Sequence, residues 1–268
     1  MTSSNARSQR GYDRLARGYQ GLEWLVFGNQ LQRARVALID QLPVWQRLLI
    51  YGDGNGRLLE QLYAVRCGCE THTPSTELSS ACERTLPSDR PWSITSVDHS
   101  PAMLRRQQLR LAATSLRKRP RSKRQVAPDG AIRFMQIDAR NYTPEENAYD
   151  VVVTPFFLDC FSQSELAQQL PIWLSGLRKD GTLLHIDFIS PQLAWQRPRA
   201  HLLLWAMHTF FRWQTGLANR QLVDSQKAIE RCGLRKTAER ISSQGMIAAQ
   251  LWRFTRACGF DSKSSEDA

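Results

Sequence analysis

The sequence predicts an α/β fold with a doubly wound, mostly parallel sheet that ends in an antiparallel strand pair. Short apolar runs alternate along the chain with segments of helical periodicity. The first of these runs ends at glycine, which is typical of a buried parallel strand followed by a tight turn. The last two apolar runs are separated only by a short polar turn, which indicates a hairpin.

The expected elements follow one another in a regular order. Ser100 begins a helix with Pro101 in its first turn, where a missing N–H costs nothing. Polar residues at 242–245 supply the turn of the final hairpin. Strands are expected at residues 46–51, 93–98, 132–137, 149–154 and 181–188, and helices at 56–65, 162–177, 202–216 and 221–232.

Two segments interrupt this alternation. Residues 67–92 and 116–130 are rich in Ser, Thr, Pro and charge, and are expected to be insertions near those positions. Residues 1–45 are expected to form an N-terminal helical cap and residues 257–268 a disordered tail. Residues 46–256 would then form the main domain.

Composition favours a soluble globular protein with a large core, because 42% of the 268 residues are hydrophobic and 23% are charged. No run of roughly 18 apolar residues occurs, and the polar N-terminus lacks the apolar segment of a secretory signal. We therefore expect a cytoplasmic protein without a transmembrane segment, with reduced cysteines. Cys67, Cys69 and Cys82, with His72, lack the paired spacing of structural zinc, so no metal is expected.

The net charge of +11 is concentrated in residues 105–124, which contain no acid. One interpretation of the basic segment 117–124 is a nucleic-acid or anionic-surface patch. The other is a solvated loop, since Pro120, Pro128 and Gly130 resist regular structure and no aromatic residue separates the basic ones. The loop is the favoured interpretation, and nucleic acid remains the alternative partner.

The segment LLIYGDGNGRLLEQL at residues 48–62 places three glycines after the first strand, with Asp53 among them. Position 57 is Arg, so the dinucleotide pattern G-x-G-x-x-G is not met, and no G-K-[ST] follows. A carboxylate in the loop would also repel phosphate. The loop therefore predicts a ligand that presents no phosphate there.

Four further motifs stand in register with this loop, namely SVDHSPAML, FMQIDARNY, YDVVVTPFFLDCF and LRKDGTLLHIDF. Together they resemble the ordered motifs of the class I S-adenosylmethionine-dependent methyltransferases over most of residues 12–254. The resemblance implies a Rossmann-like fold and S-adenosylmethionine as cofactor, whose sulfonium and ammonium groups suit an acid near the loop. The segment GYDRLARGY is similar to the small-molecule branch that includes the ubiquinone and menaquinone biosynthesis methyltransferases.

The resemblance also implies roles for individual residues. Asp98 would accept hydrogen bonds from the ribose hydroxyls, and Asp138 would accept one from the adenine amino group. Ile50 stands where the family generally has an acid, so Asp53 is expected to supply that charge. The expected cofactor-binding residues are Tyr19, Gly52, Asp53, Gly54, Asn55, Gly56, Asp98, His99, Met103, Asp138, Ala139, Thr154 and Phe156.

Several side chains keep two interpretations. Tyr12 and Tyr19 would close over the cofactor or pack in an amphipathic helix. The residues His201, Trp205 and His208 share one helix face, as a core stripe or as catalytic groups. His185 and Asp187 lie on one side of the fifth strand, and Asp187 is the better site candidate because it is nearer the strand's end.

The acceptor is less defined than the cofactor. The segment TPFF at 154–157 resembles the [DNS]-P-P-[FYW] motif of amine methyltransferases, but Thr154 has no carbonyl and Phe156 replaces a proline. Aromatic residues between 195 and 213 suggest an apolar or aromatic small-molecule acceptor under a lid, or else core. We expect O- or C-methylation, with an RNA or other nucleic-acid methyltransferase and a non-catalytic scaffold as alternatives. The sequence identifies no catalytic residue, general base or oligomeric state.

Overall fold

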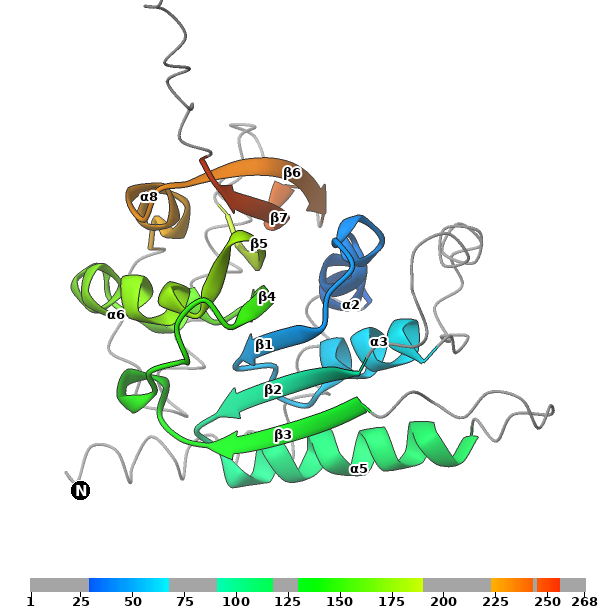
Figure 1. The fold of residues 1–268 in the computed structure, drawn as a ribbon. Coiled ribbons are helices and arrows are strands. Elements are labelled where there is room, and N and C mark those ends of the chain that lie inside the picture. The colour runs from blue at the N-terminus through cyan, green and yellow to red at the C-terminus, as the bar shows by residue number, and fades with distance from the viewer. Residues whose placement is uncertain (1–28, 68–90, 118–129, 190–222, 243–244, 256–268) are drawn as a thin grey trace, which may run out of the picture.

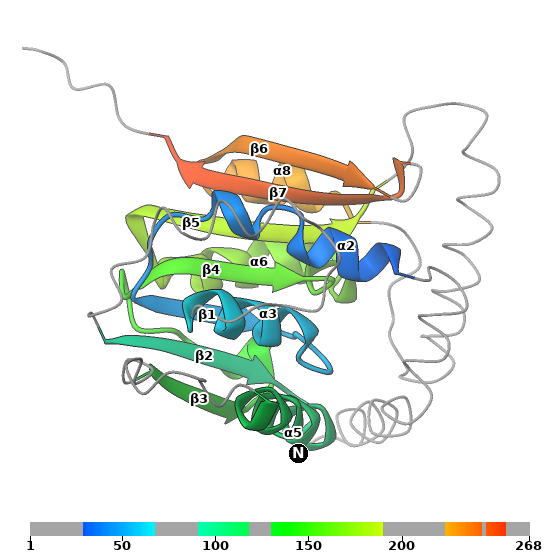
Figure 2. The same cartoon turned by 90° about the vertical axis from the view of Figure 1, so that its right-hand side faces the viewer.

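The computed structural model describes residues 29–67, 91–117, 130–189, 223–242 and 245–255. Within those ranges the chain forms a seven-stranded sheet with the order β3-β2-β1-β4-β5-β7-β6 and helices on both faces (Figures 1 and 2). The first five strands are parallel, and β7 and β6 follow as antiparallel strands. The predicted fold class is confirmed.

The strands of the sheet occur close to their expected positions. They are β1 (Arg47–Tyr51), β2 (Trp92–Asp98), β3 (Gly130–Gln136), β4 (Tyr149–Pro155), β5 (Leu177–Phe188), β6 (Leu234–Ser242) and β7 (Ile247–Phe254).

The helices divide between the two faces of the sheet. One hydrophobic cluster contains side chains of α2, α3 and α5, and a second contains side chains of α6 and α8. Figure 1 shows α6 and α8 on one side of the strands and α2 and α3 on the other. The helices are α2 (Gln30–Val36), α3 (Arg57–Arg66), α5 (Pro101–Arg117), α6 (Gln163–Ser175) and α8 (Ser225–Arg231), with short 3-10 turns η1 (Ile39–Gln41), η2 (Ala139–Asn141) and η3 (Leu158–Cys160).

Successive side chains of the central strand β1 point to opposite faces of the sheet, so one short apolar run contributes to both hydrophobic clusters. Leu48 and Ile50 face the α2–α3–α5 cluster, whereas Leu49 and Tyr51 face the α6–α8 cluster, and all four are buried. A strand covered on both faces needs apolar residues at successive positions. The continuous apolar run that predicted β1 is therefore the run that this topology requires.

Several boundaries differ from the prediction. The fifth strand begins at Leu177 rather than at 181, and α6 correspondingly ends at Ser175 rather than at 177. Leu177 pairs with Tyr149 before the register shifts, so a bulge of polar residues hid the start of the strand. At the edges of the expected insertions, Trp92 is the buried first residue of β2, and α5 extends to Arg117.

Several expected features lie outside the described residues. They are most of the N-terminal cap with Tyr12 and Tyr19, the insertion residues 68–90 and 118–129, the aromatic helical region within 190–222, and the tail. Among the helices that are described, none combines the length and the apolar character of a membrane span.

Candidate functional site

The glycine loop between β1 and α3 depends on backbone conformations that only glycine adopts easily. Gly52, Gly54 and Gly56 have φ angles of 66°, 57° and 80°. The N–H of Gly52 donates to the carbonyl oxygen of Val97 at 2.9 Å, which fixes the loop against the end of β2. A side chain at any of the three positions would be strained.

The loop is packed at both ends and open in the middle. A Cβ at Gly52 would lie 2.7 Å from the ring of Phe157, and one at Gly56 would lie 2.9 Å from the Cα of Gln107. A Cβ at Gly54 would meet no atom within 4 Å. The backbone of Gly54 is thus the part of the loop that a ligand can approach.

The acid inside the loop stabilises the helix that follows it. One carboxylate oxygen of Asp53 accepts from the N–H of Leu58 at 3.3 Å, and the other accepts from that of Leu59 at 2.8 Å. Asp53 is only 4% exposed, and burial raises its pKa to about 6, against the lowering effects of these N–H groups and of Arg35. Asp53 therefore caps the positive end of α3. A direct contact with the cofactor's ammonium remains a proposal.

Side chains of α5 hold the other side of the loop. The Nε2 of Gln107 donates to the carbonyl oxygen of Gly54 at 3.0 Å, and Nε of Arg110 donates to that of Asn55 at 3.0 Å. The buried Nδ2 of Asn55 has no hydrogen-bond partner. The prediction missed both supporting residues, although their three-residue spacing places Gln107 and Arg110 on the helix face that packs inward.

Asp98 ends β2 next to the glycine loop. Its Oδ1 accepts from the N–H of Ser100 at 2.9 Å. Burial raises the pKa of Asp98 to about 7, backbone N–H groups lower it, and the nearby charge of Asp53 raises it further. His99 is half-buried beside it, and the buried Met103 follows in the first turn of α5. The buried Asp53 thus disfavours ionisation of the half-buried Asp98.

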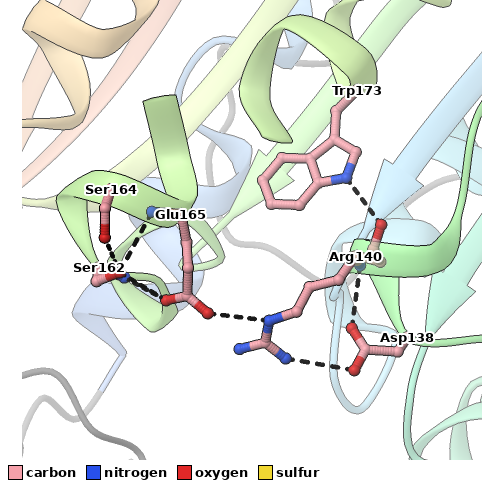
Figure 3. A network of polar contacts seen from close by, with 7 residues as sticks. Asp138, Arg140, Ser162, Ser164, Glu165 and Trp173 are labelled. Atoms are coloured by element: carbon pink, nitrogen blue, oxygen red, sulfur yellow. Dashed lines mark hydrogen bonds and ion pairs between the residues drawn. The ribbon is translucent and has the colours of Figure 1, made fainter. Parts of the chain in front are cut away.

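Asp138 belongs to a polar network that ties the end of β3 to α6 (Figure 3). Its Oδ1 accepts from the N–H of Arg140 at 3.0 Å, and its Oδ2 lies 3.3 Å from Nη1 of the same residue. The Nε of Arg140 donates to Glu165 at 3.1 Å, and the Nε1 of Trp173 donates to the carbonyl oxygen of Ala139 at 2.9 Å. Glu165 also completes a capping box with Ser162. The position of Asp138 is therefore fixed by Arg140 in η2 and, through Arg140, by Glu165 in α6.

The end of β4 carries a buried hydroxyl whose partner lies on β5. Oγ1 of Thr154 lies 3.0 Å from Nδ1 of His185, and Nε2 of that ring lies 3.0 Å from Oγ of Ser225 in α8. Burial lowers the pKa of His185 to about 3, so the ring is neutral and joins two strands to a helix. The hydroxyl of Thr154 is already bonded to His185. Thr154 therefore belongs to the expected site only by its position near the end of β4.

Phe156 follows β4 in a strained conformation. Its φ of 52° is unusual for a bulky residue. Its N–H donates to the carbonyl oxygen of Ile186 at 2.7 Å, and its ring lies 5.1 Å from that of Phe188. The guanidinium carbon of Arg35 lies 5.1 Å from the centre of the Phe156 ring. These contacts hold an aromatic pair at the ends of β4 and β5.

Asp187 is the second-to-last residue of β5 and is 2% exposed. Its Oδ1 accepts from the N–H of Phe188 at 2.9 Å, and its Oδ2 has no hydrogen-bond partner. The Oδ2 lies 3.8 Å from the neutral ring of His185. Burial and then the nearby charge of Asp159 raise the pKa of Asp187 well above its ordinary value.

Most of the predicted residues come together at one edge of the sheet. They follow the carboxyl ends of β1, β2, β3 and β4, and the strand order reverses between β1 and β4. Ligands of doubly wound sheets bind at such a reversal. The open backbone at Gly54 and the acids on neighbouring strand ends fit a cationic ligand with hydroxyl donors, and the unpartnered Nδ2 of Asn55 can donate to an acceptor on that ligand. Tyr19 lies outside the described residues. Among the residues that are described, no three His, Cys, Asp or Glu side chains lie close enough together to hold a metal ion.

The sequence matches no protein-family model and no curated protein. Its structure is similar to those of several methyltransferases. The mitomycin 7-O-methyltransferase MmcR is 15% identical with a TM-score of 0.51, and the similarity covers 90% of this chain and 60% of that one. An O-methyltransferase family 2 protein from Planctomyces limnophilus DSM 3776, in complex with apigenin, is 16% identical with a TM-score of 0.56, covering 91% and 62%.

A third similar structure is the magnesium protoporphyrin IX methyltransferase from Synechocystis PCC 6803 with bound SAH. It is 13% identical with a TM-score of 0.50, and 84% of this chain and 81% of that chain are covered. This chain spans 60% and 62% of the length of the first two proteins. At these identities the comparisons establish a common fold.

Proposed function

We propose that this protein is an S-adenosylmethionine-dependent methyltransferase that methylates an oxygen or carbon atom of a small apolar or aromatic molecule. The observation that carries the proposal is the glycine loop, which is open to a ligand only at Gly54 among its three glycines. Asp98 at the end of β2 and Asp138 just after β3 lie at the same edge. The fold shared with methyltransferases supports the same assignment.

Each part of the cofactor has residues that would hold it. The methionine half would lie along the backbone of residues 52–56, and the ribose hydroxyls would donate to Asp98. The adenine would lie between His99 and Met103, with its amino group directed to Asp138. When bound, the cofactor supplies a methyl group on a sulfonium that is already activated for displacement.

The protein's contribution is then mainly positioning. A rigid loop, held by Gln107 and Arg110, fixes the backbone against which the donor would lie. Aligning two reactants in this way can contribute roughly 7 to 11 kcal/mol to lowering the barrier.

The nature of the acceptor is argued from the end of β4. Thr154 offers no carbonyl oxygen for an amine, and its hydroxyl is bonded to His185. The rings of Phe156 and Phe188 give this edge an apolar wall, which suits an aromatic or apolar acceptor. One protein of similar fold was solved in complex with apigenin, which supports an aromatic ligand at this edge. A closer relation to the ubiquinone and menaquinone branch rests on GYDRLARGY, outside the described residues.

Titration calorimetry with S-adenosylhomocysteine and with NADH tests the cofactor. We expect micromolar binding of S-adenosylhomocysteine and none of NADH, whereas the reverse result would overturn the proposal. A methyl-transfer screen with phenols, flavonoids, quinones, lipids and RNA then tests the acceptor. Transfer to phenols or quinones supports the small-molecule enzyme, transfer to RNA contradicts it, and cofactor binding without any transfer indicates a scaffold.

A further inference from the structure

Arg35 is a buried cation on α2, next to the proposed cofactor site. Its side chain is only 5% exposed, and it lies one helical turn after Leu31 on the buried face of the helix. An apolar residue is expected on such a face. A guanidinium that gives up its hydration needs compensating groups around it, so the surroundings of Arg35 indicate its role.

The ring of Phe156 is one of these compensating groups. The guanidinium carbon of Arg35 lies 5.1 Å from the centre of the ring, within the range of a cation–π interaction. Phe156 has a φ of 52°, and its N–H is bonded to the carbonyl oxygen of Ile186 at the end of β5. The strained backbone after β4 therefore places an aromatic ring against the cation of α2.

The charge of Arg35 also acts on Asp53 in the glycine loop. Burial raises the pKa of Asp53 to about 6, and its two backbone N–H partners and the charges of Arg35 and Arg110 lower it. The helix α2 contacts α3, which Asp53 caps, and both helices pack on the same face of the sheet (Figure 2). Phe156 packs against the same hydrophobic cluster. The ring, the cation and the acid therefore belong to one face.

Through these two contacts Arg35 acts on both chain segments that leave the sheet where the strand order reverses. Asp53 follows β1 and Phe156 follows β4, and these two strands pair directly. The proposed cofactor site lies at this reversal. The cation of α2 thus joins the helix before the sheet to both sides of the site.

Other charged groups face Asp53 from the remaining elements. Nη1 of Arg110 in α5 lies 3.0 Å from Oε2 of Glu60 in α3, so its charge is shared between two acids. At the end of β2, burial raises the pKa of Asp98 to about 7, and the charge of Asp53 adds to that rise. An ionised Asp98 in turn opposes ionisation of Asp53. Arg35 therefore makes a separate contribution to keeping Asp53 ionised.

The ionised form of Asp53 is the form that caps α3. Each of its oxygens accepts one N–H, from Leu58 and from Leu59. A protonated carboxyl carries its proton on one oxygen, which makes that oxygen a poor acceptor. We propose that Arg35 is a positioning residue of the cofactor site which, lying on the ring of Phe156, keeps Asp53 charged as the cap of α3 and so preserves the shape of the glycine loop. This inference rests on the proposed function.

The first test requires no ligand. Carboxyl carbon NMR of the ligand-free protein, with Asp53→Asn to assign the signal, should show Asp53 titrating at about pH 6. Arg35→Met and the polar neutral variant Arg35→Gln should move that titration to higher pH, because each removes a nearby positive charge. Arg35→Lys should keep it close to the wild-type value. Arg33→Met, at an exposed position of the same helix, is the matched control and should leave it unchanged.

A titration of Asp53 that both neutral variants of Arg35 leave in place would overturn the proposal. The conservative variant Arg35→Lys gives the complementary check, because it keeps the charge and loses the planar guanidinium. A shift as large in Arg35→Lys as in Arg35→Met would show that the charge of residue 35 does not control Asp53, and would also reject the proposal.

The second test measures the consequence for the cofactor site by calorimetry with S-adenosylhomocysteine. Compared with the wild type at the same pH, Arg35→Met should bind roughly fivefold more weakly at pH 6.5 and within about twofold at pH 8.5, where Asp53 is ionised in both proteins. Arg35→Lys should restore the affinity at pH 6.5. A loss of equal size at both pH values would indicate a merely structural role and reject the proposal.

A double variant shows whether Arg35 acts through Asp53. In the Asp53→Asn protein, which has no carboxyl group to ionise at this position, Arg35→Met should change the affinity by the same factor at pH 6.5 and at pH 8.5. A pH-dependent effect that persists in this background would assign the action of Arg35 to another group, such as Asp98, and would contradict the proposal.

The outcomes separate this inference from the function beneath it. If the wild type does not bind S-adenosylhomocysteine, the proposed function fails and this inference fails with it. If the wild type binds it and Arg35→Met binds it equally well at both pH values, this inference alone fails and the cofactor assignment stands.

Discussion

Gln107 joins the glycine loop to β2 through both ends of its side-chain amide. Its Nε2 donates to the carbonyl oxygen of Gly54 at 3.0 Å, and its Oε1 accepts from Oγ of Ser96 at 2.7 Å. The side chain is fully buried, and its backbone would collide with a Cβ at Gly56. The shape of the loop is therefore set as much by α5 as by its own glycines.

Replacing Gln107 should affect both stability and ligand binding. Gln107→Leu keeps the approximate volume but leaves the half-buried carbonyl of Gly54 and the buried hydroxyl of Ser96 without this partner. We expect the free energy of unfolding to fall by about 1 to 3 kcal/mol and S-adenosylhomocysteine to bind more weakly. Chemical denaturation and calorimetry measure the two effects. Gln108→Leu, at an exposed position of the same helix, is the control, and equal behaviour of the two variants would contradict the role given to Gln107.

Two glycines allow the conformational cost of a side chain to be separated from its effect on the ligand. Gly54 and Gly233 both have positive φ, at 57° and 84°, and neither Cβ would meet an atom within 4 Å. Alanine at either position should lower stability by about 1 kcal/mol. Only Gly54→Ala should weaken cofactor binding, roughly tenfold or more. Calorimetry with S-adenosylhomocysteine measures the affinity of both variants. Normal binding by Gly54→Ala would show that the cofactor does not lie against Gly54.

Cofactor binding should depend on the ionisation of Asp98. Burial, together with the charge of Asp53, raises the pKa of Asp98 to about 7. A cationic ligand with hydroxyl donors favours the ionised carboxylate, so S-adenosylmethionine should bind more tightly at pH 8 than at pH 5.5 and release a proton. Calorimetry in two buffers of different ionisation enthalpy measures that proton. Asp98→Asn should weaken binding and abolish the release, and an unchanged release would assign it to another group.

The same raised pKa makes an opposite prediction for the ligand-free protein. The stability that protonated Asp98 contributes is fully present below pH 4 and is lost as the pH rises through about 7. Asp98→Asn should therefore be more stable than the wild type at pH 8, by about 2 kcal/mol, with little difference at pH 4. Thermal unfolding without ligand at the two pH values gives the comparison. The prediction fails if the variant is less stable at pH 8.

The network around Arg140 should affect which nucleobase the cofactor site prefers. Arg140 holds the Asp138 carboxylate from one side and Glu165 holds Arg140 from the other. Arg140→Ala should therefore reduce the preference for S-adenosylhomocysteine over S-inosylhomocysteine, which lacks the adenine amino group. Stability should change by less than about 1 kcal/mol, because the ion pairs are partly exposed. Arg178→Ala, which breaks an ion pair with Asp150, is the control and should leave the preference intact.

The basic segment should be dispensable for the proposed reaction. Its flanking residues, Arg117 and Gly130, end α5 and begin β3, so the segment joins the sheet at the amino end of β3. That end is about 23 Å from Asp138, given the length of the strand. Replacing residues 118–128 with a short Gly/Ser linker should preserve cofactor binding and transfer. Loss of transfer with binding intact, together with RNA binding that falls steeply with salt, would favour the nucleic-acid alternative.

The strands and the ligand edge could be predicted because the information that sets them is local. The buried run of β1 is apolar at successive positions, and the turn after it requires glycines. Asp98 and Asp138 were predicted from the family resemblance, and their roles stay predictions. Asp98 ends β2, Asp138 lies two residues after β3, and parallel strands bring their carboxyl ends to one edge. The bulge near Leu177 was missed because its polar residues interrupt the apolar pattern that marks a strand.

The supporting contacts could not be predicted, because they join segments far apart in the chain. The partner of Gln107 is the carbonyl of a residue 53 positions earlier, and Ser225 is 40 positions from His185. A sequence shows that a side chain is polar but not which backbone oxygen it will meet. For the same reason the hydrogen bonds that both oxygens of Asp53 accept from α3 were not predicted, and the role of this acid toward the cofactor stays a prediction.

The place of β7 between β5 and β6 determines the order in which the sheet can be completed on the ribosome. β6 is synthesised before β7, yet its ladder is formed with β7. Until residues 247–254 emerge, β6 has no strand to join and one side of β5 presents unpaired backbone groups. Open edges of this kind promote association with other chains. A nascent chain stopped after Gly245 would therefore be prone to aggregate, and this hairpin can form only after residues 247–254 have emerged.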